Sequence, residues 1–213
     1  MSLLTTLIDL VLHLDTHLMT LVQDYGVWVY AILFAIIFAE TGLVFAPFLP
    51  GDSLLFVAGA LCGLDALQLH WLMPLLMLAA FSGDNTNYWV GRLIGMRVFQ
   101  RFEGRLLKRE HLDKTHSFYE KHGGKTILFA RFMPIIRTFA PFVAGIALMR
   151  YRLFVLYSAA GSIGWIGSLT LAGFFFGNIP VVKNNLTLII LGVIFLSFLP
   201  AMIQYIQHKN SKI

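Results

Sequence analysis

The chain has 213 residues, of which 58% are hydrophobic and 13% are charged, whereas an ordinary soluble domain is roughly 25% charged. A soluble domain of this size cannot bury so much apolar surface, and the mean hydropathy is +0.75. This composition excludes a disordered chain, a fibrous repeat and an ordinary soluble enzyme, and it leaves room for about four membrane spans of about 20 residues each. The single cysteine, Cys62, cannot form an intramolecular disulfide.

The formal net charge is +5, but the distribution of charge along the chain is more informative than the sum. The first basic residue is Arg92, so the chain begins without the basic region of a secretory signal peptide, and we expect its N-terminal segment to be retained. All 11 acidic residues lie at or before Glu120, and the later connections carry only basic residues. Such an excess of Lys and Arg is typical of the cytoplasmic side of a membrane protein.

The first third of the chain contains an amphipathic segment, a span and a broken apolar segment. Leu and Val recur at helical spacing among polar residues over 1–24, which predicts an amphipathic helix in the membrane interface. Residues 26–42 are apolar almost throughout and predict a first span. The apolar stretch 43–63 has two prolines and a Pro-Gly-Asp sequence near its middle, which would disrupt a continuous helix. It predicts a re-entrant hairpin with Pro-Gly-Asp at its tip.

The middle of the chain contains a span, a basic segment and a second apolar segment broken by prolines. Residues 69–95 predict a second span, and the segment 96–125 has an excess of basic residues that places it in the cytoplasm. The apolar segment 126–149 again contains two prolines, Pro134 and Pro141, and now two arginines. It predicts a second re-entrant hairpin, which enters the membrane from the cytoplasmic side.

The last third contains two further apolar segments, 153–177 and 186–206, which predict two more spans. The sequence therefore predicts an all-α polytopic membrane protein, a single membrane domain over 1–213. It has about four full transmembrane helices, two re-entrant helical hairpins and an N-terminal amphipathic helix. We expect both termini to lie in the cytoplasm.

Short sequence blocks recur in the two halves of the chain and predict an internal repeat. The recurring blocks are FAPF at 45–48 and 139–142, VAG at 57–59 and 143–145, and the related pair FAE at 38–40 and FAR at 129–131. Two related hairpins that enter from opposite faces are typical of an inverted repeat. That architecture places a binding site at mid-membrane, between the broken helices.

Five ionisable residues lie within the apolar segments: Glu40, Asp52, Asp84, Arg131 and Arg137. Each costs at least about 2.5 to 3.5 kcal/mol to place at membrane depth, so such groups face a partner or a wet cavity. The two carboxylates around the first hairpin can pair with the two arginines of the second if the hairpins meet. These residues are either structural ion pairs, or carboxylates that bind protons beside guanidinium groups that bind an anion.

The functional interpretation rests on how these groups influence one another. Burial raises the pKa of a carboxyl and a neighbouring arginine lowers it, so proton binding at Glu40 or Asp52 becomes coupled to a substrate that moves the arginine. The planar guanidinium group of arginine forms bidentate hydrogen bonds with a phosphate or a carboxylate. Pro50 and Gly51 would line the same cavity, where the N-terminus of a broken helix at Pro-Gly-Asp would expose backbone N–H groups.

Weaker features of the sequence leave more than one interpretation open. Asp84 and Asn87 either line the same cavity or form bonds across the bundle. The four tryptophans are interpreted as interface or packing residues. The spacing of Gly91 and Gly95, and of Gly173 and Gly177, predicts close helix packing.

Several kinds of site are not expected. The sequence has no metal-ligand spacing, no Walker loop and no nucleophile elbow. We therefore expect no metal, no cofactor, no nucleic-acid partner and no enzymatic activity.

Three blocks carry a family resemblance: FAETGLVFAPFLPGDSLLFVAGAL at 38–61, GDNTNYWVGRLIG at 83–95 and GGKTILFARFMPIIRTFAPFVAGIALM at 123–149. Over essentially the whole chain the sequence resembles the DedA family of bacterial inner-membrane proteins, also called SNARE-associated or VTT-domain proteins. The resemblance implies two re-entrant hairpins, dependence on the proton motive force and a link to recycling of the carrier lipid undecaprenyl phosphate. It also implies that Glu40, Asp52, Arg131 and Arg137 are functional residues.

The leading hypothesis is a proton-motive-force-dependent transporter or flippase for a phosphate-bearing lipid, with undecaprenyl phosphate as cargo and a role in envelope integrity. The alternatives are a proton/cation antiporter for pH and osmotic balance, a lipid scramblase and a membrane scaffold that transports nothing. The expected partners are protons and membrane lipids that include polyprenyl phosphate, and a homo-oligomer is compatible with the sequence. The expected location is the bacterial cytoplasmic membrane.

Overall fold

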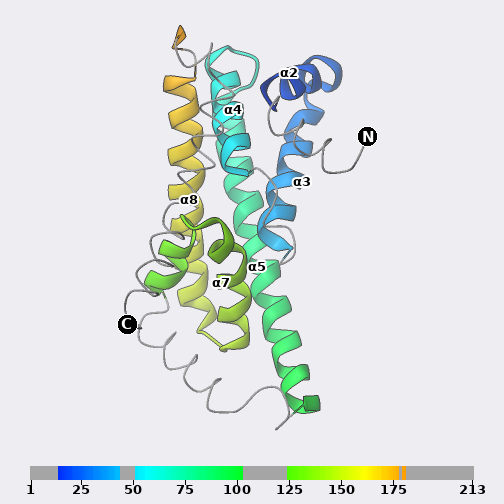
Figure 1. Ribbon diagram of the computed structural model, residues 1–213, viewed down its shortest axis with the longest axis vertical. Helices are drawn as coiled ribbons and strands as arrows, with labels where there is room; N and C mark the ends of the chain where they lie inside the picture. Colours follow the sequence, from blue (N-terminus) through cyan, green and yellow to red (C-terminus); the bar gives the residue numbers. More distant parts are fainter. Residues whose placement is uncertain (1–13, 44–50, 103–123, 178, 181–213) are drawn as a thin grey trace, which may run out of the picture. The chain divides into compact units, whose positions relative to one another are not determined.

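The computed structural model describes residues 14–43, 51–102, 124–177 and 179–180. Helices make up almost all of these residues, and the described part of the chain contains no strand (Figure 1). The all-α class predicted from the sequence is therefore confirmed for the residues described.

The first three described helices follow the predicted elements closely. Helix α2 (Leu14–Tyr25) covers the later part of the predicted amphipathic segment, and α3 (Trp28–Gly42) covers the first predicted span. Helix α4 (Gly51–Gly63) forms the second arm of the first predicted hairpin. The tip of that hairpin, including Pro50, lies outside the described residues, so its re-entrant path stays a prediction.

Helix α5 (Leu69–Phe102) is longer than the second predicted span. It has 34 residues and continues past Gly95, so the helix extends beyond the predicted span, whose end at Gly95 stays a prediction. The helix runs through Pro74 near its start and through the polar residues at its centre. The remainder of the predicted basic cytoplasmic segment, 103–123, lies outside the described residues.

The second predicted hairpin is a helix, a turn and a second helix. Residues 124–130 are helical, a turn follows, and α7 (Pro134–Ile146) begins at a proline whose missing N–H costs nothing at a helix start. Met133 is extended, as a residue before proline prefers. The second proline of this segment, Pro141, lies inside α7, and the helix continues through it. The direction in which this segment enters a membrane stays a prediction.

Helix α8 (Tyr151–Phe176) matches the predicted span at 153–177. Its 26 residues extend about 39 Å, and within the described part of the chain it is the one helix both long and apolar enough to cross a membrane. Three shorter apolar helical stretches accompany it, at Trp28–Gly42, Gly51–Gly63 and Ile136–Ile146. The last predicted span, 186–206, lies outside the described residues, so the number of four spans stays a prediction.

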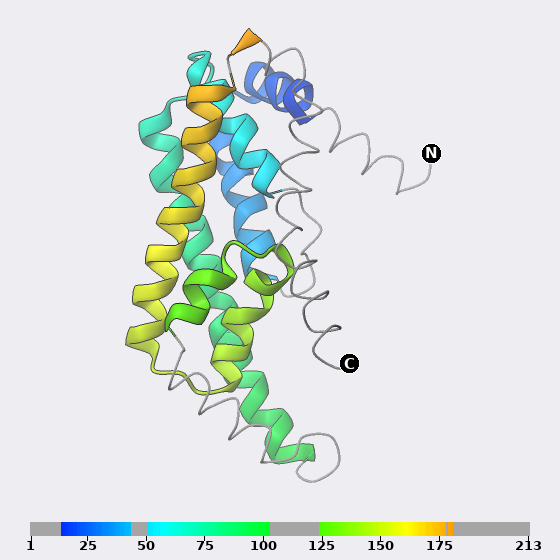
Figure 2. The same cartoon turned by 60° about the vertical axis from the view of Figure 1, so that its left-hand side comes forward.

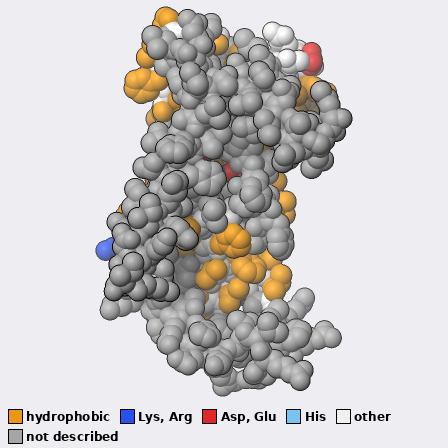
Figure 3. Space-filling view, viewed as in Figure 1, with side chains coloured by type: hydrophobic (Ala, Val, Ile, Leu, Met, Phe, Trp, Pro, Cys, Tyr) orange, Lys and Arg blue, Asp and Glu red, His pale blue; other side chains and the backbone are white. Residues whose placement is uncertain are grey.

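The distribution of side chains differs from that in a typical soluble protein, because many large apolar side chains are exposed beside a buried apolar core. Trp28, Leu156 and Phe175 are each more than 60% exposed, whereas several charged side chains are buried. Orange hydrophobic side chains lie at the surface in several places where described residues are visible (Figure 3). Extensive exposed apolar surface is typical of contact with lipid or another protein.

The chain divides into two compact units that interleave along the sequence. Unit 1 comprises residues 1–34, 50–76 and 166–213, and unit 2 comprises residues 35–49 and 77–165. The long helices α3, α5 and α8 therefore each contribute residues to both units. The two units are described separately below.

In unit 1, α4 packs closely against the later part of α8, and both views show the two helices side by side (Figures 1 and 2). A Cβ atom added at Gly59 would collide with the carbonyl oxygen of Thr170, and one added at Gly173 would collide with the carbonyl oxygen of Phe56. Gly59 follows Phe56 by three residues, and Gly173 follows Thr170 by three residues. Each helix therefore presents one glycine to a carbonyl oxygen of the other helix, and the two backbones come into contact.

Unit 2 contains the same reciprocal contact between α7 and α5. A Cβ atom added at Gly145 would collide with the carbonyl oxygen of Tyr88, and one added at Gly91 would collide with that of Phe142. The sequence FVAG occurs in both short helices, at 56–59 and at 142–145. The recurring VAG block therefore makes the same packing contact in each unit, which supports the predicted internal repeat. The close packing predicted for Gly91 and Gly173 is confirmed.

We expect Gly59→Ala and Gly145→Ala each to lower the free energy of unfolding by about 1 to 3 kcal/mol, because the added methyl group meets backbone atoms of the partner helix. A melting curve of the detergent-solubilised protein should show Tm lower by several degrees. The matched control is Gly164→Ala in α8, where the nearest atom to an added Cβ is 3.9 Å away. Unchanged Tm values for both variants would contradict the packing described.

Candidate functional site

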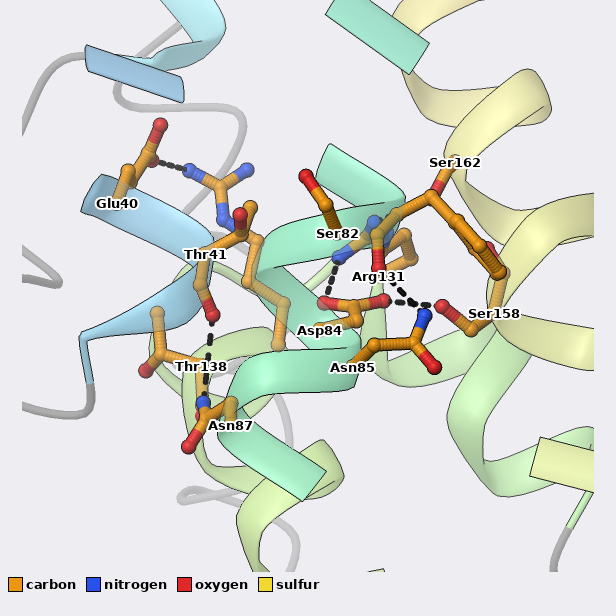
Figure 4. A network of polar contacts seen from close by, with 12 residues as sticks. Glu40, Thr41, Ser82, Asp84, Asn85, Asn87, Arg131, Thr138, Ser158 and Ser162 are labelled. Atoms are coloured by element: carbon orange, nitrogen blue, oxygen red, sulfur yellow. Dashed lines mark hydrogen bonds and ion pairs between the residues drawn. The ribbon is translucent and has the colours of Figure 1, made fainter. Parts of the chain in front are cut away.

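A cluster of buried polar side chains fills the centre of unit 2 (Figure 4). It draws on the end of α3, the middle of α5, the turn before α7, the start of α7 and the first half of α8. Its buried members are Glu40, Thr41, Asp84, Asn87, Arg131, Arg137, Thr138, Ser158 and Ser162. Opposite charges in a buried cluster can form ion pairs, and two such pairs are present.

Close contact between two glycines brings the end of α3 to the centre of α5. Gly42 lies against Gly83, where a Cβ added to either residue would come within 3.2 Å of backbone or closer. Gly42 directly follows Glu40 and Thr41, and Gly83 directly precedes Asp84. Because neither glycine has a side chain, α3 and α5 approach closely, and the carboxylates of Glu40 and Asp84 lie in one cluster.

The first ion pair joins Arg131 to Asp84. Nη1 of Arg131 lies 2.6 Å from Oδ1 of Asp84, and the two side chains are 3% and 1% exposed. The hydroxyl of Ser158 donates a hydrogen bond to the second carboxylate oxygen of Asp84, and Arg131 also donates to the hydroxyl of Ser162. Both ends of this pair are thus held by the same face of α8.

The second ion pair joins Arg137 to Glu40. Nη2 of Arg137 donates to Oε1 of Glu40, and the two side chains are almost completely buried. Glu40 lies in the last turn of α3, and Arg137 lies in the first turn of α7. The pair therefore connects the end of one helix to the start of another.

The indole ring of Trp165 connects the two ion pairs. The guanidinium carbon of Arg137 lies 4.4 Å from the centre of this ring, and that of Arg131 lies 5.4 Å from it. The side chain is only 2% exposed. Cation–π attraction of this kind gains strength when the groups are removed from water. Trp165 is therefore a shared support for both arginines.

Asn87 completes the cluster from α5. Its amide nitrogen donates to the carbonyl oxygen of Thr138 at 2.6 Å and to that of Thr41 at 3.3 Å. One side chain thus bonds to the backbone of α3 and of α7, next to the residues that carry the Glu40–Arg137 pair. Asn87 thus bonds across the bundle, and whether it also lines a cavity stays a prediction.

The structure brings together most of the residues predicted for the site. Glu40 pairs with an arginine of the second hairpin, as expected. Arg131 pairs with Asp84, a residue for which the sequence left both a cavity-lining and a bonding role open. Asp52 lies in the first turn of α4, in unit 1, and its role stays a prediction. Gly51 starts the same helix, and Pro50 lies outside the described residues.

Three functional candidates on α8 were not found from the sequence. Ser158, Ser162 and Trp165 follow one another at intervals of four and three residues, so they share one face of the helix. A polar stripe on an otherwise apolar helix was the available signal. Trp165 was interpreted as an interface or packing residue, and the structure shows it packed against both arginines. Within the residues described, no group of three His, Cys, Asp or Glu side chains is placed to hold a metal ion.

The apolar exterior, the span-length helix α8 and the buried charges together define a helical membrane protein with a polar centre. The VTT domain family matches residues 49–175, more than half of the chain. The chain belongs to this family, the DedA family. The matched region contains Asp84, both arginines and Trp165, whereas Glu40 precedes it.

Named relatives agree with this assignment. The chain is 55% identical over 213 residues to Protein DedA of Escherichia coli. The matched region covers 99% of this chain and 97% of that protein. It is 44% identical over 170 residues to a Mycobacterium tuberculosis protein described as an uncharacterized membrane protein, covering 79% and 74% of the two chains. It is 35% identical over 153 residues to the inner membrane protein YqjA of Escherichia coli, covering 71% and 69%. No solved structure matches the chain significantly.

We expect Asp84→Ala to lower the free energy of unfolding by about 3 to 5 kcal/mol, because it leaves the buried Arg131 guanidinium without its carboxylate. The double variant Asp84→Leu/Arg131→Met should be less destabilised than either single change, since it removes both charges. Thermal unfolding followed by circular dichroism in detergent measures this. The control Lys125→Ala, at an exposed cation of the same unit, should leave Tm unchanged. Additive effects of the two changes would contradict a coupled pair.

We expect Trp165→Leu to lower Tm more than Trp165→Phe, because phenylalanine keeps an aromatic face for the two guanidinium groups. The matched control is Trp71→Leu, which makes the same change at a side chain that is 66% exposed. Melting curves of the purified variants provide the comparison. Equal Tm values for the leucine and phenylalanine variants would show that Trp165 acts only through its volume.

Proposed function

We propose that the protein is a proton-coupled membrane transporter for a phosphate-bearing lipid, with undecaprenyl phosphate as the cargo. The observation that supports this proposal is the two buried arginines in unit 2, each of which pairs with a carboxylate. An arginine that can exchange its carboxylate for a phosphate is a phosphate site whose occupancy depends on protons. The chemistry is that of a carrier, so we propose no enzymatic step.

Competition for one guanidinium group provides the coupling. An ionised carboxylate and a phosphate both bind the Arg137 guanidinium, and they repel each other. Protonation of Glu40 removes its charge and leaves Arg137 available to an anion. By thermodynamic reciprocity, a bound phosphate then favours the protonated form of Glu40 to the same extent. Proton and phosphate therefore bind together and leave together.

The direction of transport follows from this competition. The lipid phosphate binds on the more acidic face of the membrane and leaves on the more alkaline face. A proton that enters the cell across 100 mV supplies about 2.3 kcal/mol. With the outer face acidic, the carrier moves its cargo inward, as the recycling of a carrier lipid requires. We propose that both chain termini lie on the cytoplasmic side of the bacterial cytoplasmic membrane.

Arginine suits this task better than lysine. Its planar fork holds two oxygens of one phosphate and remains charged at all physiological pH values. We propose that Arg131 and Arg137 hold the phosphate, that Glu40 carries the exchanging proton, and that Asp52 carries or gates a second proton. Asp84 and Asn87 keep the arginines in place between turnovers.

A membrane scaffold that transports nothing is the second candidate function. The observation that favours it is that both arginines have a carboxylate partner, as purely structural ion pairs would. The two functions differ in what they require of the pair. A structural pair tolerates exchange of its two residues, whereas a carrier needs the acid and the base in their own environments.

The test is transport of undecaprenyl phosphate in liposomes that contain the purified protein, with and without an imposed pH gradient. We expect gradient-dependent movement in the wild type, a loss of at least tenfold in Arg137→Ala and in Arg131→Lys, and loss of gradient dependence in Glu40→Gln. The control Lys125→Gln should keep full activity, because that side chain is exposed and outside the cluster.

Other outcomes favour the rival functions. Movement without a gradient would identify a scramblase, and a cation flux without added polyprenyl phosphate would identify an antiporter. Restored cellular function in the charge swap Glu40→Arg/Arg137→Glu would favour the scaffold. Each of these results would contradict the proposed coupling.

A further inference from the structure

A second cationic site lies at the turn between α7 and α8, apart from the two buried ion pairs. A pocket of about 750 Å³ is lined there by Arg92 of α5, by Arg150 and Arg152, and by apolar side chains of the turn. No acidic side chain is among the described residues that line it. Three arginines around one pocket provide a strong attraction for an anion.

The floor of this pocket is held in place by hydrogen bonds. Arg92 donates to the hydroxyl of Tyr88 at 2.9 Å, and that hydroxyl donates to the carbonyl oxygen of Met149 at 2.6 Å. Tyr88 is completely buried and stacks on Phe154, with ring centres 4.4 Å apart. The turn and Arg92 are therefore fixed before any ligand binds.

The rim of the pocket combines exposed charge with exposed apolar surface. Arg150 and Arg152 are exposed, and Leu148 and Leu153 are 44% and 45% exposed. Leu148 has a left-handed φ of 55°, at the position after a helix end where glycine is usual. A leucine in this conformation costs free energy, and backbone hydrogen bonds from Leu148 and Met149 to the end of α7 hold it there while its side chain stays exposed at the rim.

The surroundings of the pocket are those of a membrane interface. The span-length helix α8 begins at Tyr151, directly at the pocket, so the pocket lies at one end of the apolar segment. Trp89 is 42% exposed, lies against Tyr151 and carries the Arg92 guanidinium 5.6 Å from its ring centre. Tryptophan and tyrosine are enriched at the headgroup level of membranes.

We infer that this pocket binds the phosphate headgroup of an anionic membrane lipid, with an acyl chain along Leu148 and Leu153. The three arginines supply the charge that the phosphate requires, and the exposed leucines supply the surface that distinguishes a lipid from a free phosphate ion. This inference does not depend on the proposed transport, because none of these residues belongs to the buried ion pairs.

The test uses the full-length protein in detergent and follows Tm as lipid is added. We expect a saturable rise in Tm with phosphatidylglycerol and none with phosphatidylcholine of the same chains. Each exposed arginine should contribute about fivefold in affinity, so Arg150→Gln/Arg152→Gln should weaken the response on the order of 20- to 30-fold. Higher salt should weaken it further.

Two control variants separate charge from apolar contact. Lys125→Gln removes one exposed cation outside the pocket and should leave the phosphatidylglycerol affinity unchanged, in contrast to the charge-matched Arg152→Gln. Leu148→Gly should keep or raise Tm without lipid, because glycine adopts the left-handed φ freely, yet it should weaken lipid binding.

Three results would overturn the inference. They are an equal response to phosphatidylcholine, an unchanged affinity in the double arginine variant, and an equal response to inorganic phosphate at the same concentration. The last result would identify a site for a free anion instead of a lipid. Since the readout is binding and not transport, failure here leaves the proposed function to be judged by its own experiment.

Discussion

The structure of unit 2 depends on the cost of burying two guanidinium groups. Arginine keeps its charge at any physiological pH, so in an apolar interior it must be neutralised by a neighbour. Arg131 and Arg137 come from one short stretch of chain, but their carboxylate partners lie on α5 and α3. The requirement for neutralisation thus ties three segments together, and the serines of α8 and the ring of Trp165 add a fourth.

Close glycine contacts allow these charges to meet. A side chain at Gly83 would collide with Thr41, and one at Gly145 would collide with the backbone of Tyr88. Each contact lets two helix backbones approach far more closely than side-chain packing permits, which brings short polar side chains such as Asp84 within reach of an arginine. Because lipid gives helices no hydrophobic reason to associate, packing of this kind and polar contacts supply the attraction. The glycine contacts therefore bring the helices close enough for the ion pairs to form.

The sequence predicted the helical class, the long apolar helix and four of the charged residues in the cluster, because burial cost and hydrophobic pattern are properties of single segments. It did not predict that Arg131 pairs with Asp84, since that depends on how closely two helices pack. Trp165 could not be distinguished from the other tryptophans by composition. Pro134 begins α7 and Pro141 lies within it, a difference that the presence of two prolines in one apolar segment does not reveal. The features that could not be predicted are therefore contacts between helices.

The two ion pairs differ in how readily they could open. Asp84 lies in the middle of α5, and Ser158 holds its second oxygen, so this pair is fixed within a rigid helix. Glu40 lies in the last turn of α3 and Arg137 in the first turn of α7, where each charge meets the unfavourable end of its own helix dipole. Pairing brings each charge to the favourable end of the other helix. If the pair separates, each charge is left at the unfavourable end of its own helix dipole. A proton on Glu40 or an anion bound to Arg137 removes this electrostatic cost. Within the proposed function, the Glu40–Arg137 pair is the one suited to exchange its carboxylate, and Arg131 contacts the phosphate while it stays paired with Asp84.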